Sequence, residues 1–270
     1  MSEDRSYVIG TQPAEIERLG VQHRVWRSSV LDFWRLGGVT EGMTVIDAGC
    51  GPGHATLDLA EIVGPTGRVI ALERSRRFLD ALKERALQRD VANILTIETD
   101  LADFDWASVS ADHIWCRWAL AFVAEPALIV RGMARALKPG GAALFHEYYD
   151  YASWRLAPRS TPFESYVAKI IARWRASGGE PDIALALPAM IRDAGLKMES
   201  ARPVVFAATM DNFVSRWPMS FAREYLPSMV DSGDVSAVEG AAIARILLDT
   251  EADPNALVIT PGVLQIVARK

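Results

Sequence analysis

The amino-acid sequence predicts an α/β fold in which a mostly parallel, seven-stranded sheet carries helices on both faces. From about residue 42 to residue 148, short apolar runs rich in Val and Ile alternate with segments of helical periodicity, which is typical of a parallel sheet wrapped by helices. A glycine-rich turn, within VIDAGCGPGHATLDLA, joins the first run to the first helix. Asp47, Glu73 and Asp100 end the first three runs. We therefore expect a binding site at the carboxyl edge of the sheet.

The core elements follow in the order strand, helix, strand. We expect Ser75 to cap the second helix and the segment KPGG at 138–141 to end the third, because serine accepts a hydrogen bond at a helix start while Pro and Gly stop a helix. The strands are predicted near 43–48, 68–73, 93–99, 111–117 and 141–147, and the helices near 54–63, 75–89 and 125–138.

The pattern changes after residue 148. An irregular helical excursion is expected at 151–180, a short helix at 187–195 with Gly195 as its C-cap, a sixth strand at 197–208, a helical stretch at 211–251 and a last strand at 256–268. The predicted division is a helical arm at 1–40 that closes the binding site, a Rossmann-like core at 41–150, a lid insertion at 151–185, the rest of the core sheet at 186–209 and 256–270, and a helical lid insertion at 210–255.

Composition limits the class of protein. The 270 residues are 50% hydrophobic and 23% charged, with a net charge of -5, which predicts either one large core or one core with a sizeable appendage. Because no basic run is longer than Arg76–Arg77, we expect no nucleic-acid partner. Cys50 and Cys116 both lie in apolar runs, so no disulfide is expected. With neither a signal-peptide pattern nor a bilayer-length apolar run, the sequence predicts a cytoplasmic protein without a membrane partner.

The glycine turn indicates what kind of ligand approaches the backbone. Its spacing is Gly49-x-Gly51-x-Gly53, whereas the nicotinamide fingerprint requires its third glycine at the position of His54. Asp47 would repel a pyrophosphate but could hold an ammonium group, directly or through water. The sequence therefore favours a ligand with positive charge near the turn and no phosphates.

Two further strand ends extend this ligand. The Glu73 carboxylate could accept both hydroxyls of a ribose. The side chain of Asp100 and the N–H of Leu101 could contact the amino edge of an adenine. An amino acid, a ribose and an adenine in one molecule would fit all three strand ends. The alternative for each acid is an ordinary residue at a strand end, paired in the case of Glu73 with a neighbouring arginine.

The motifs DAGCGPG, ALE, TDLADF and ALKPGG, in this order and spacing, resemble those of class I (seven-stranded, Rossmann-like) S-adenosylmethionine-dependent methyltransferases. Within that family they are most similar to the small-molecule branch of the ubiquinone and menaquinone biosynthesis type. The resemblance covers roughly 42–208 and the last strand, and it implies S-adenosyl-L-methionine as the cofactor. The implied cofactor-binding residues are Tyr7, Gln22, His23, Asp47, Ala48, Gly49, Cys50, Gly51, Gly53, Glu73, Arg74, Asp100, Leu101 and Arg117.

Methyl transfer by in-line displacement needs positioning and, for some acceptors, a base. We expect the catalytic residues at the ends of the fourth and fifth strands: His146 as the leading candidate base, Glu147, and Arg117. A buried Arg117 should pair either with Glu147 or with a carboxylate of the cofactor or substrate. The alternative for His146 is a hydrogen-bonded core residue. No metal site is predicted.

The fourth strand continues as CRWALAF, without the Asp/Asn-Pro-Pro-aromatic motif of enzymes that methylate a nucleobase or an amide nitrogen. The bulky residues of the predicted lid segments favour a small acceptor of apolar or aromatic character. Two alternatives stay open at this point. One is a protein that binds S-adenosylmethionine without transferring methyl, in a structural or cyclase-like use, and the other is an NAD(P)-dependent oxidoreductase.

Overall fold

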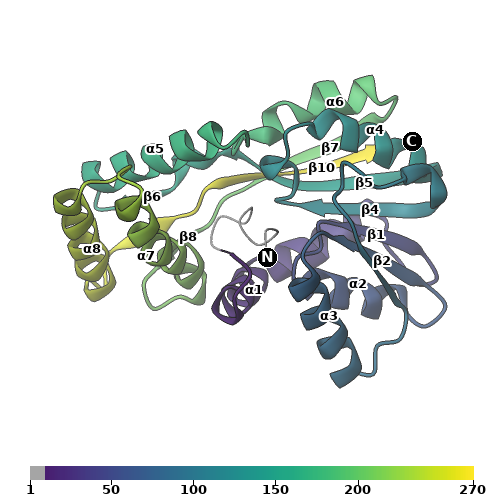
Figure 1. The fold of residues 1–270 in the computed structure, drawn as a ribbon, viewed down its shortest axis with the longest axis horizontal. Coiled ribbons are helices and arrows are strands. Elements are labelled where there is room, and N and C mark those ends of the chain that lie inside the picture. The colour runs from purple at the N-terminus through teal and green to yellow at the C-terminus, as the bar shows by residue number, and fades with distance from the viewer. Residues whose placement is uncertain (1–9) are drawn as a thin grey trace.

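The computed structural model describes residues 10–270 and has a seven-stranded sheet at its centre (Figure 1). The strand order is β3-β2-β1-β4-β5-β10-β7, and β10 runs opposite in direction to the other six strands. This confirms the predicted α/β fold with a mostly parallel sheet. The strands are β1 (Thr44–Ala48), β2 (Arg68–Glu73), β3 (Ile94–Glu98), β4 (Ala111–Arg117), β5 (Leu137–Asp150), β7 (Lys197–Val204) and β10 (Gly262–Arg269).

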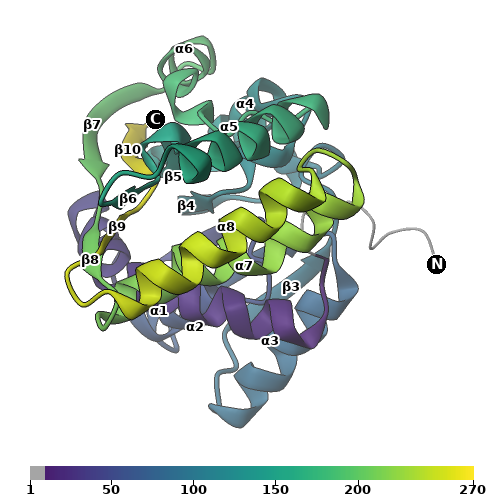
Figure 2. The same ribbon diagram turned by 90° about the vertical axis from the view of Figure 1, so that its left-hand side faces the viewer.

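Helices cover both faces of the sheet (Figures 1 and 2). On one face lie α1 (Pro13–Gly37), α2 (His54–Val63) and α3 (Arg76–Gln88), and on the other lie α4 (Pro126–Ala136) and α6 (Leu187–Asp193). The α3 helix begins as expected, because the Ser75 hydroxyl accepts a hydrogen bond from the N–H of Phe78. The chain order reverses at β1, whose two neighbours are β2 and β4, so the crevice at their carboxyl ends is the switch point where open sheets bind ligands.

Two predicted strands are interrupted. The segments 197–208 and 256–268 each leave the main sheet and enter a second, three-stranded antiparallel sheet of order β6-β9-β8. Its strands are β6 (Arg155–Ala157), β8 (Ala207–Thr209) and β9 (Leu257–Ile259). Thr260 lies fully buried at the crossing, and its hydroxyl accepts a hydrogen bond from the N–H of Phe206 at 3.0 Å. The expectation of continuous strands was wrong because these bends redirect each strand between two sheets.

The helical segments outside the core also differ from expectation. The predicted irregular excursion contains β6 and a regular helix, α5 (Thr161–Ala176), and the predicted stretch 211–251 is two helices, α7 (Arg216–Asp231) and α8 (Ala237–Ala252). A capping box at Ser236 starts α8. The α7 helix packs on α1 and α8 packs on α5, beyond the carboxyl ends of β4 and β5 (Figures 1 and 2). Within residues 10–270, no helix combines the length and apolar character needed to cross a membrane.

Candidate functional site

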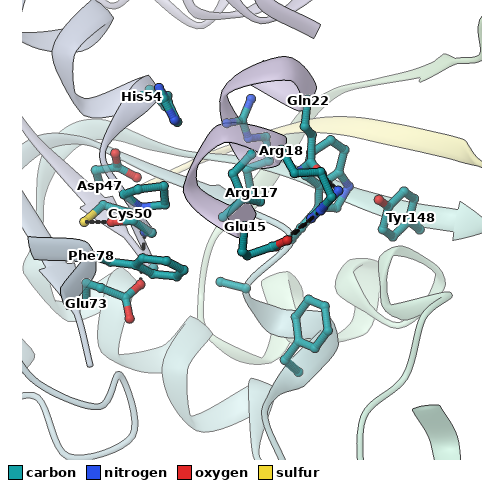
Figure 3. A pocket seen from close by; sticks show the side chains of 18 of the residues that line it. Glu15, Arg18, Gln22, Asp47, Cys50, His54, Glu73, Phe78, Arg117 and Tyr148 are labelled. Carbon is teal, nitrogen blue, oxygen red and sulfur yellow. Dashed lines mark hydrogen bonds and ion pairs between the residues drawn. The ribbon is translucent and has the colours of Figure 1, made fainter. Parts of the chain in front are cut away.

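A cavity of about 240 Å³ lies at the carboxyl ends of β1, β2, β4 and β5, between the glycine turn and helices α1 and α7. Figure 3 shows Asp47, Cys50 and Glu73 on one side of it and Tyr148 on the other. The cavity brings together most of the cofactor-binding residues predicted among 10–270. These lining residues are Gln22, Asp47, Gly49, Cys50, Gly51, Glu73, Arg74, Asp100, Leu101 and Arg117.

Other predicted residues lie elsewhere. His23, Ala48 and Gly53 do not line the cavity, and Tyr7 lies outside the described residues. Ala48 is fully buried in β1. A Cβ at Gly53 would lie 2.4 Å from Leu82 Cδ1, so this glycine serves the packing of the turn on α3. The geometry therefore does not support a direct ligand contact by the side chain of His23 or by Gly53.

Gly51 is the glycine of the turn that leaves space. All three glycines have positive φ, and a Cβ at Gly49 would lie 2.7 Å from that of Ala119. At Gly51, by contrast, a Cβ would meet no atom within 4 Å, and Gly51 lines the cavity. The turn thus exposes backbone to the cavity at Gly51, which is what close approach of a ligand requires.

The Asp47 carboxyl is buried at the base of the cavity. It accepts a hydrogen bond from the Thr56 hydroxyl at 2.6 Å. Burial raises the pKa of Asp47 to about 6, with the Thr56 hydrogen bond and the positive charge of Arg117 opposing the shift. Asp47 is therefore a carboxylate at neutral pH that a nearby cation would stabilise further.

Glu73 holds the turn while it lines the cavity. One of its oxygens accepts a hydrogen bond from the N–H of Gly51 at 3.0 Å, and the other accepts one from the N–H of Ser75 at 2.8 Å. Glu73 thus fixes the turn and presents its carboxylate at the cavity. Farther along the same edge, Asp100 accepts a hydrogen bond from the N–H of Ala102 at 2.9 Å.

Arg117 ends β4 and lines the cavity without an ion pair among residues 10–270. Its Nη2 donates to Nδ1 of His23 across 3.3 Å, and its buried Nη1 has no hydrogen-bond partner in the described chain. Burial lowers the pKa of Arg117 to about 10, and the charge of Asp47 opposes that shift. The pairing with Glu147 considered above is not formed. Arg117 therefore stays cationic at neutral pH, with donor capacity left for an anionic ligand group.

His23 does not line the cavity but accepts a hydrogen bond from Arg117, which does. Because arginine can only donate, Nδ1 of His23 must be the acceptor and Nε2 carries the proton, which it donates to the Asp58 carboxylate at 3.0 Å. Arg27 also binds Asp58, at 2.7 Å. Burial lowers the pKa of His23 despite the hydrogen bond to Asp58. The result is a chain of hydrogen bonds from Asp58 through His23 to Arg117.

His146 does not reach the cavity. Its side chain is fully buried, its Nδ1 pairs with the side chain of Gln265 at 3.2 Å, and its Nε2 has no hydrogen-bond partner in the described chain. The rings of Trp26 and Trp118 pack edge-on against it. A general base must come within hydrogen-bond reach of the substrate, so this placement does not support the predicted role of His146. It supports the alternative, a core histidine.

Glu147 is likewise absent from the cavity lining. Its Oε1 accepts hydrogen bonds from the N–H groups of Ala119 and Leu120 at 3.0 and 3.1 Å, while Oε2 has no partner in the described chain. Burial raises the pKa of Glu147 to about 8, against the effect of these hydrogen bonds. The bonds hold the turn directly after Trp118, which has a φ of 50°. The placement supports a positioning role and not contact with the reacting atoms.

Most of the aromatic residues that line the cavity come from the segment after β4, from β5 and from the segments around α5 and α7, and the part of the cavity that they line is called here the aromatic half. The Trp118 ring is stacked between those of Tyr148 and Trp217, with centroid distances of 5.2 and 5.6 Å. The aromatic half is lined by Trp118, Phe122, Tyr148, Tyr151, Trp154, Trp174, Trp217 and Phe221. Trp154, Trp174, Trp217 and Phe221 belong to the predicted lid segments 151–185 and 210–255 and reach the cavity.

Sequence reasoning missed Glu15 and Arg18 on α1. They form a buried, two-point ion pair that lines the cavity. Their i,i+3 spacing is that of an ordinary surface pair on a helix, so no sequence signal set them apart. Within residues 10–270, no three or more His, Cys, Asp or Glu side chains are grouped so that they could hold a metal ion.

The chain is 32% identical over 120 residues to demethylmenaquinone methyltransferase of Staphylococcus aureus, a match covering 44% of this chain and 48% of that protein. The match thus spans about half the length of that curated relative. The fold is similar to that of geranyl diphosphate C-methyltransferase from Streptomyces coelicolor A3(2), with a TM-score of 0.56, 16% identity, and coverage of 92% of this chain and 80% of that chain.

The fold is also similar to that of the [4+2]-cyclase SpnF, with a TM-score of 0.54, 19% identity, and coverage of 86% of this chain and 76% of that chain. At such identities the likeness concerns the fold alone. A family model described as "Methyltransferase domain" matches residues 39–176, just over half of the chain, including the glycine turn and the ends of β1, β2 and β4. The chain belongs to this methyltransferase-domain family.

Proposed function

We propose that this protein transfers a methyl group from S-adenosylmethionine to a small organic acceptor. The observation that carries the proposal is one cavity that Asp47, Glu73 and Arg117 line together with the open backbone of Gly51. A carboxylate and a guanidinium in one cavity complement an amino acid zwitterion, and a second carboxylate at the next strand end suits a ribose. Membership of the methyltransferase-domain family supports this reading of the site.

The residues divide between the parts of the cofactor. Asp47 would bind the ammonium group of the methionine part, and Arg117 would bind its carboxylate. The backbone of Gly49 and Gly51 would lie against the methionine part. Glu73 would bind the ribose hydroxyls. The adenine contacts would come from Asp100, Leu101 and Arg74. Cys50 and Gln22 also line the cavity. We propose that Cys50 packs against the cofactor and that Gln22 bounds the site on the side of α1.

When bound, S-adenosylmethionine supplies an activated methyl group and leaves as the thioether S-adenosylhomocysteine. An electron pair of the acceptor would form the new bond to the methyl carbon while the carbon–sulfur bond breaks towards sulfur, and the acceptor would release a proton where it carried one. The chain's contribution is to hold the two partners in line, which is worth up to about 7 to 11 kcal/mol. The packed rings of Trp118 and Trp217 would keep water out of the reacting region.

The acceptor is proposed to be an apolar or aromatic small molecule bound in the aromatic half of the cavity. Planar rings pack well against stacked and edge-on aromatic side chains. The predicted lid segments 151–185 and 210–255 both contribute to this half, the first through Tyr151, Trp154 and Trp174 and the second through Trp217 and Phe221 on α7.

We place the protein in the cytoplasm, because Cys50 and Cys116 are free and buried, which suits a reducing compartment.

Isothermal titration with S-adenosylmethionine and S-adenosylhomocysteine, with NAD and NADPH as controls, tests the cofactor. Micromolar binding of the first two alone is expected. Incubation with S-adenosylmethionine labelled in its methyl group and a panel of aromatic acceptors then tests transfer. Cofactor binding with no labelled product would favour the non-transferring alternative, for which the fold of the [4+2]-cyclase is a parallel. No cofactor binding would contradict the whole assignment.

A further inference from the structure

A charged pair lies inside the cavity beside the aromatic rings. Arg18 Nε and Nη2 donate to the two carboxylate oxygens of Glu15, each across 2.7 Å. The side chains are only 7% and 8% exposed, and both residues line the cavity. In Figure 3 the pair lies on α1, across the cavity from Asp47 and Glu73 and near Tyr148.

We propose that the Glu15–Arg18 pair is the polar subsite for the acceptor and that it binds a hydroxyl group on a planar aromatic ring. This inference rests on the proposed function, because it concerns the second substrate of the same cavity. It assigns to α1 a role in acceptor specificity that is separate from cofactor binding.

The pair has hydrogen-bonding capacity to spare. Arg18 has five N–H groups, of which two bond to Glu15 and one bonds from Nη1 to Gln22 Oε1 at 3.3 Å. The remaining two have no hydrogen bond to any residue among 10–270. Each Glu15 oxygen also has a second lone pair. A ligand group can therefore bond to both members without breaking the ion pair.

Aromatic side chains surround the same pair. The Arg18 guanidinium lies over the Phe221 ring at 5.6 Å from its centroid. Gln22, its other partner, accepts a hydrogen bond from the indole N–H of Trp217 at 2.9 Å. Burial raises the pKa of the Tyr148 and Tyr151 hydroxyls, and the positive charge of Arg18 opposes that shift. A ligand group at the pair would thus have its carbon skeleton against rings.

A hydroxyl matches the pair better than other polar groups. It donates to the Glu15 carboxylate and accepts from the Arg18 guanidinium at once, whereas an ammonium only donates and a carboxylate only accepts. An added charge of either sign would also face a like charge in a buried site, which is costly. A neutral group that both donates and accepts avoids this cost.

Structural stabilisation alone does not account for the pair. Burying two charges costs several kcal/mol per ion, and the attraction between them often does no more than repay it. The same helix carries a second i,i+3 pair, Asp32 and Arg35, on its exposed surface, where an ion pair forms with little loss of hydration. A buried pair beside a cavity is instead what a polar binding site requires.

Matched ligands and variants test the inference. Isothermal titration in the presence of S-adenosylhomocysteine compares 2-naphthol with 2-methoxynaphthalene and 4-phenylphenol with 4-methoxybiphenyl. The wild-type protein should bind at least one phenol about tenfold more tightly than its methyl ether, the effect of a hydrogen-bonded hydroxyl at a charged site. E15Q and R18Q should lose this preference and keep their affinity for S-adenosylhomocysteine. The control D32N, on the exposed pair, should keep both.

R18K tests the same site with a smaller risk of misfolding than the neutral variants carry. It retains the positive charge but lacks the two-pronged guanidinium, so it should bind S-adenosylhomocysteine normally and lose most of the hydroxyl preference. The inference is overturned if a wild-type protein that binds S-adenosylhomocysteine shows no preference for a phenol or binds no member of the panel. It is also overturned if R18K or E15Q keeps the preference. Failure of the wild type to bind S-adenosylhomocysteine would instead contradict the proposed function.

Discussion

Arg117 on β4 donates a hydrogen bond from Nη2 to Nδ1 of His23 on α1, across 3.3 Å. This contact joins the carboxyl end of the sheet to the first helix. It also orients a guanidinium whose Nη1 has no partner within residues 10–270. Asp58 in α2 completes the chain by holding the other nitrogen of His23. One buried network therefore links three elements to a cation that lines the cavity.

Replacing Arg117 should weaken cofactor binding with little loss of stability. R117Q removes the charge proposed to bind the methionine carboxylate, and we expect the dissociation constant for S-adenosylhomocysteine to rise by about 10- to 100-fold. The free energy of unfolding should stay level or rise, because a buried arginine without an ion pair is costly. Isothermal titration and thermal melting measure the two effects. R135Q, at an exposed position of α4, is the control, and an unchanged affinity in R117Q would refute the assignment.

His23 is predicted to be a positioning residue that acts through Arg117. H23Q leaves a side-chain oxygen that can accept the arginine hydrogen bond, whereas H23L leaves none. We expect H23Q to keep most of the affinity for S-adenosylhomocysteine and H23L to lose about tenfold. Isothermal titration compares the two at matched thermal stability. Equal losses in both variants would show that His23 serves only packing.

Asp47 should make cofactor binding depend on pH. In the ligand-free protein the pKa of Asp47 is raised to about 6, chiefly by burial. A bound ammonium favours the carboxylate, so affinity should fall as the pH drops through about 6, by up to about tenfold per pH unit. D47N should bind more weakly at pH 8 and lose this dependence. Titrations from pH 5 to pH 8 check the prediction, and the same slope in D47N would contradict it.

The strand-end acids could be predicted from the sequence, because they depend on local order alone. Asp47, Glu73 and Asp100 each end an apolar run next to a turn, and the ends of neighbouring parallel strands lie at one edge of a sheet. The helix at 54–63 and the cap at Ser75 were likewise local features and are confirmed.

Features that depend on distant segments could not be predicted. His146 and Tyr148 share one face of β5 by strand alternation, yet Tyr148 lines the cavity and His146 lies behind Trp118. The position of the Trp118 ring decides which of the two side chains reaches the cavity. The alternation of residues along a strand does not predict that position. The bend at Thr260 and the burial of the Glu15–Arg18 pair depend in the same way on tertiary packing.

Glu147 should make the stability of the protein depend on pH. Its pKa is raised from 4.5 to about 8, mainly by burial, so between these values the folded state holds a proton that the unfolded state has lost. The contribution of this group to the free energy of unfolding should therefore be at its full value and constant below about pH 4.5. Above that it should fall by about 1.4 kcal/mol per pH unit until the pH reaches about 8.

The variant E147Q keeps an oxygen for the N–H groups of Ala119 and Leu120 but cannot ionise. The difference in unfolding free energy between the wild type and E147Q should therefore decline from pH 5 to pH 8 and then level off. Urea denaturation at each pH measures it. E61Q, at an exposed position, is the control and should show a constant difference. A constant difference for E147Q would mean that Glu147 is ionised throughout.

Two glycines of the turn should respond differently to alanine. In G53A the new Cβ would lie 2.4 Å from Leu82 Cδ1, and overpacking of this kind costs about 1 to 3 kcal/mol. In G51A it meets no atom within 4 Å, so the cost is that of the left-handed backbone alone, about 1 to 2 kcal/mol. Gly51 lines the cavity, however, and the added methyl group would occupy space proposed for the cofactor. G53A should therefore lower the melting temperature more, and G51A should weaken S-adenosylhomocysteine binding more. The opposite pattern would assign the ligand contact to Gly53, as the sequence resemblance implied.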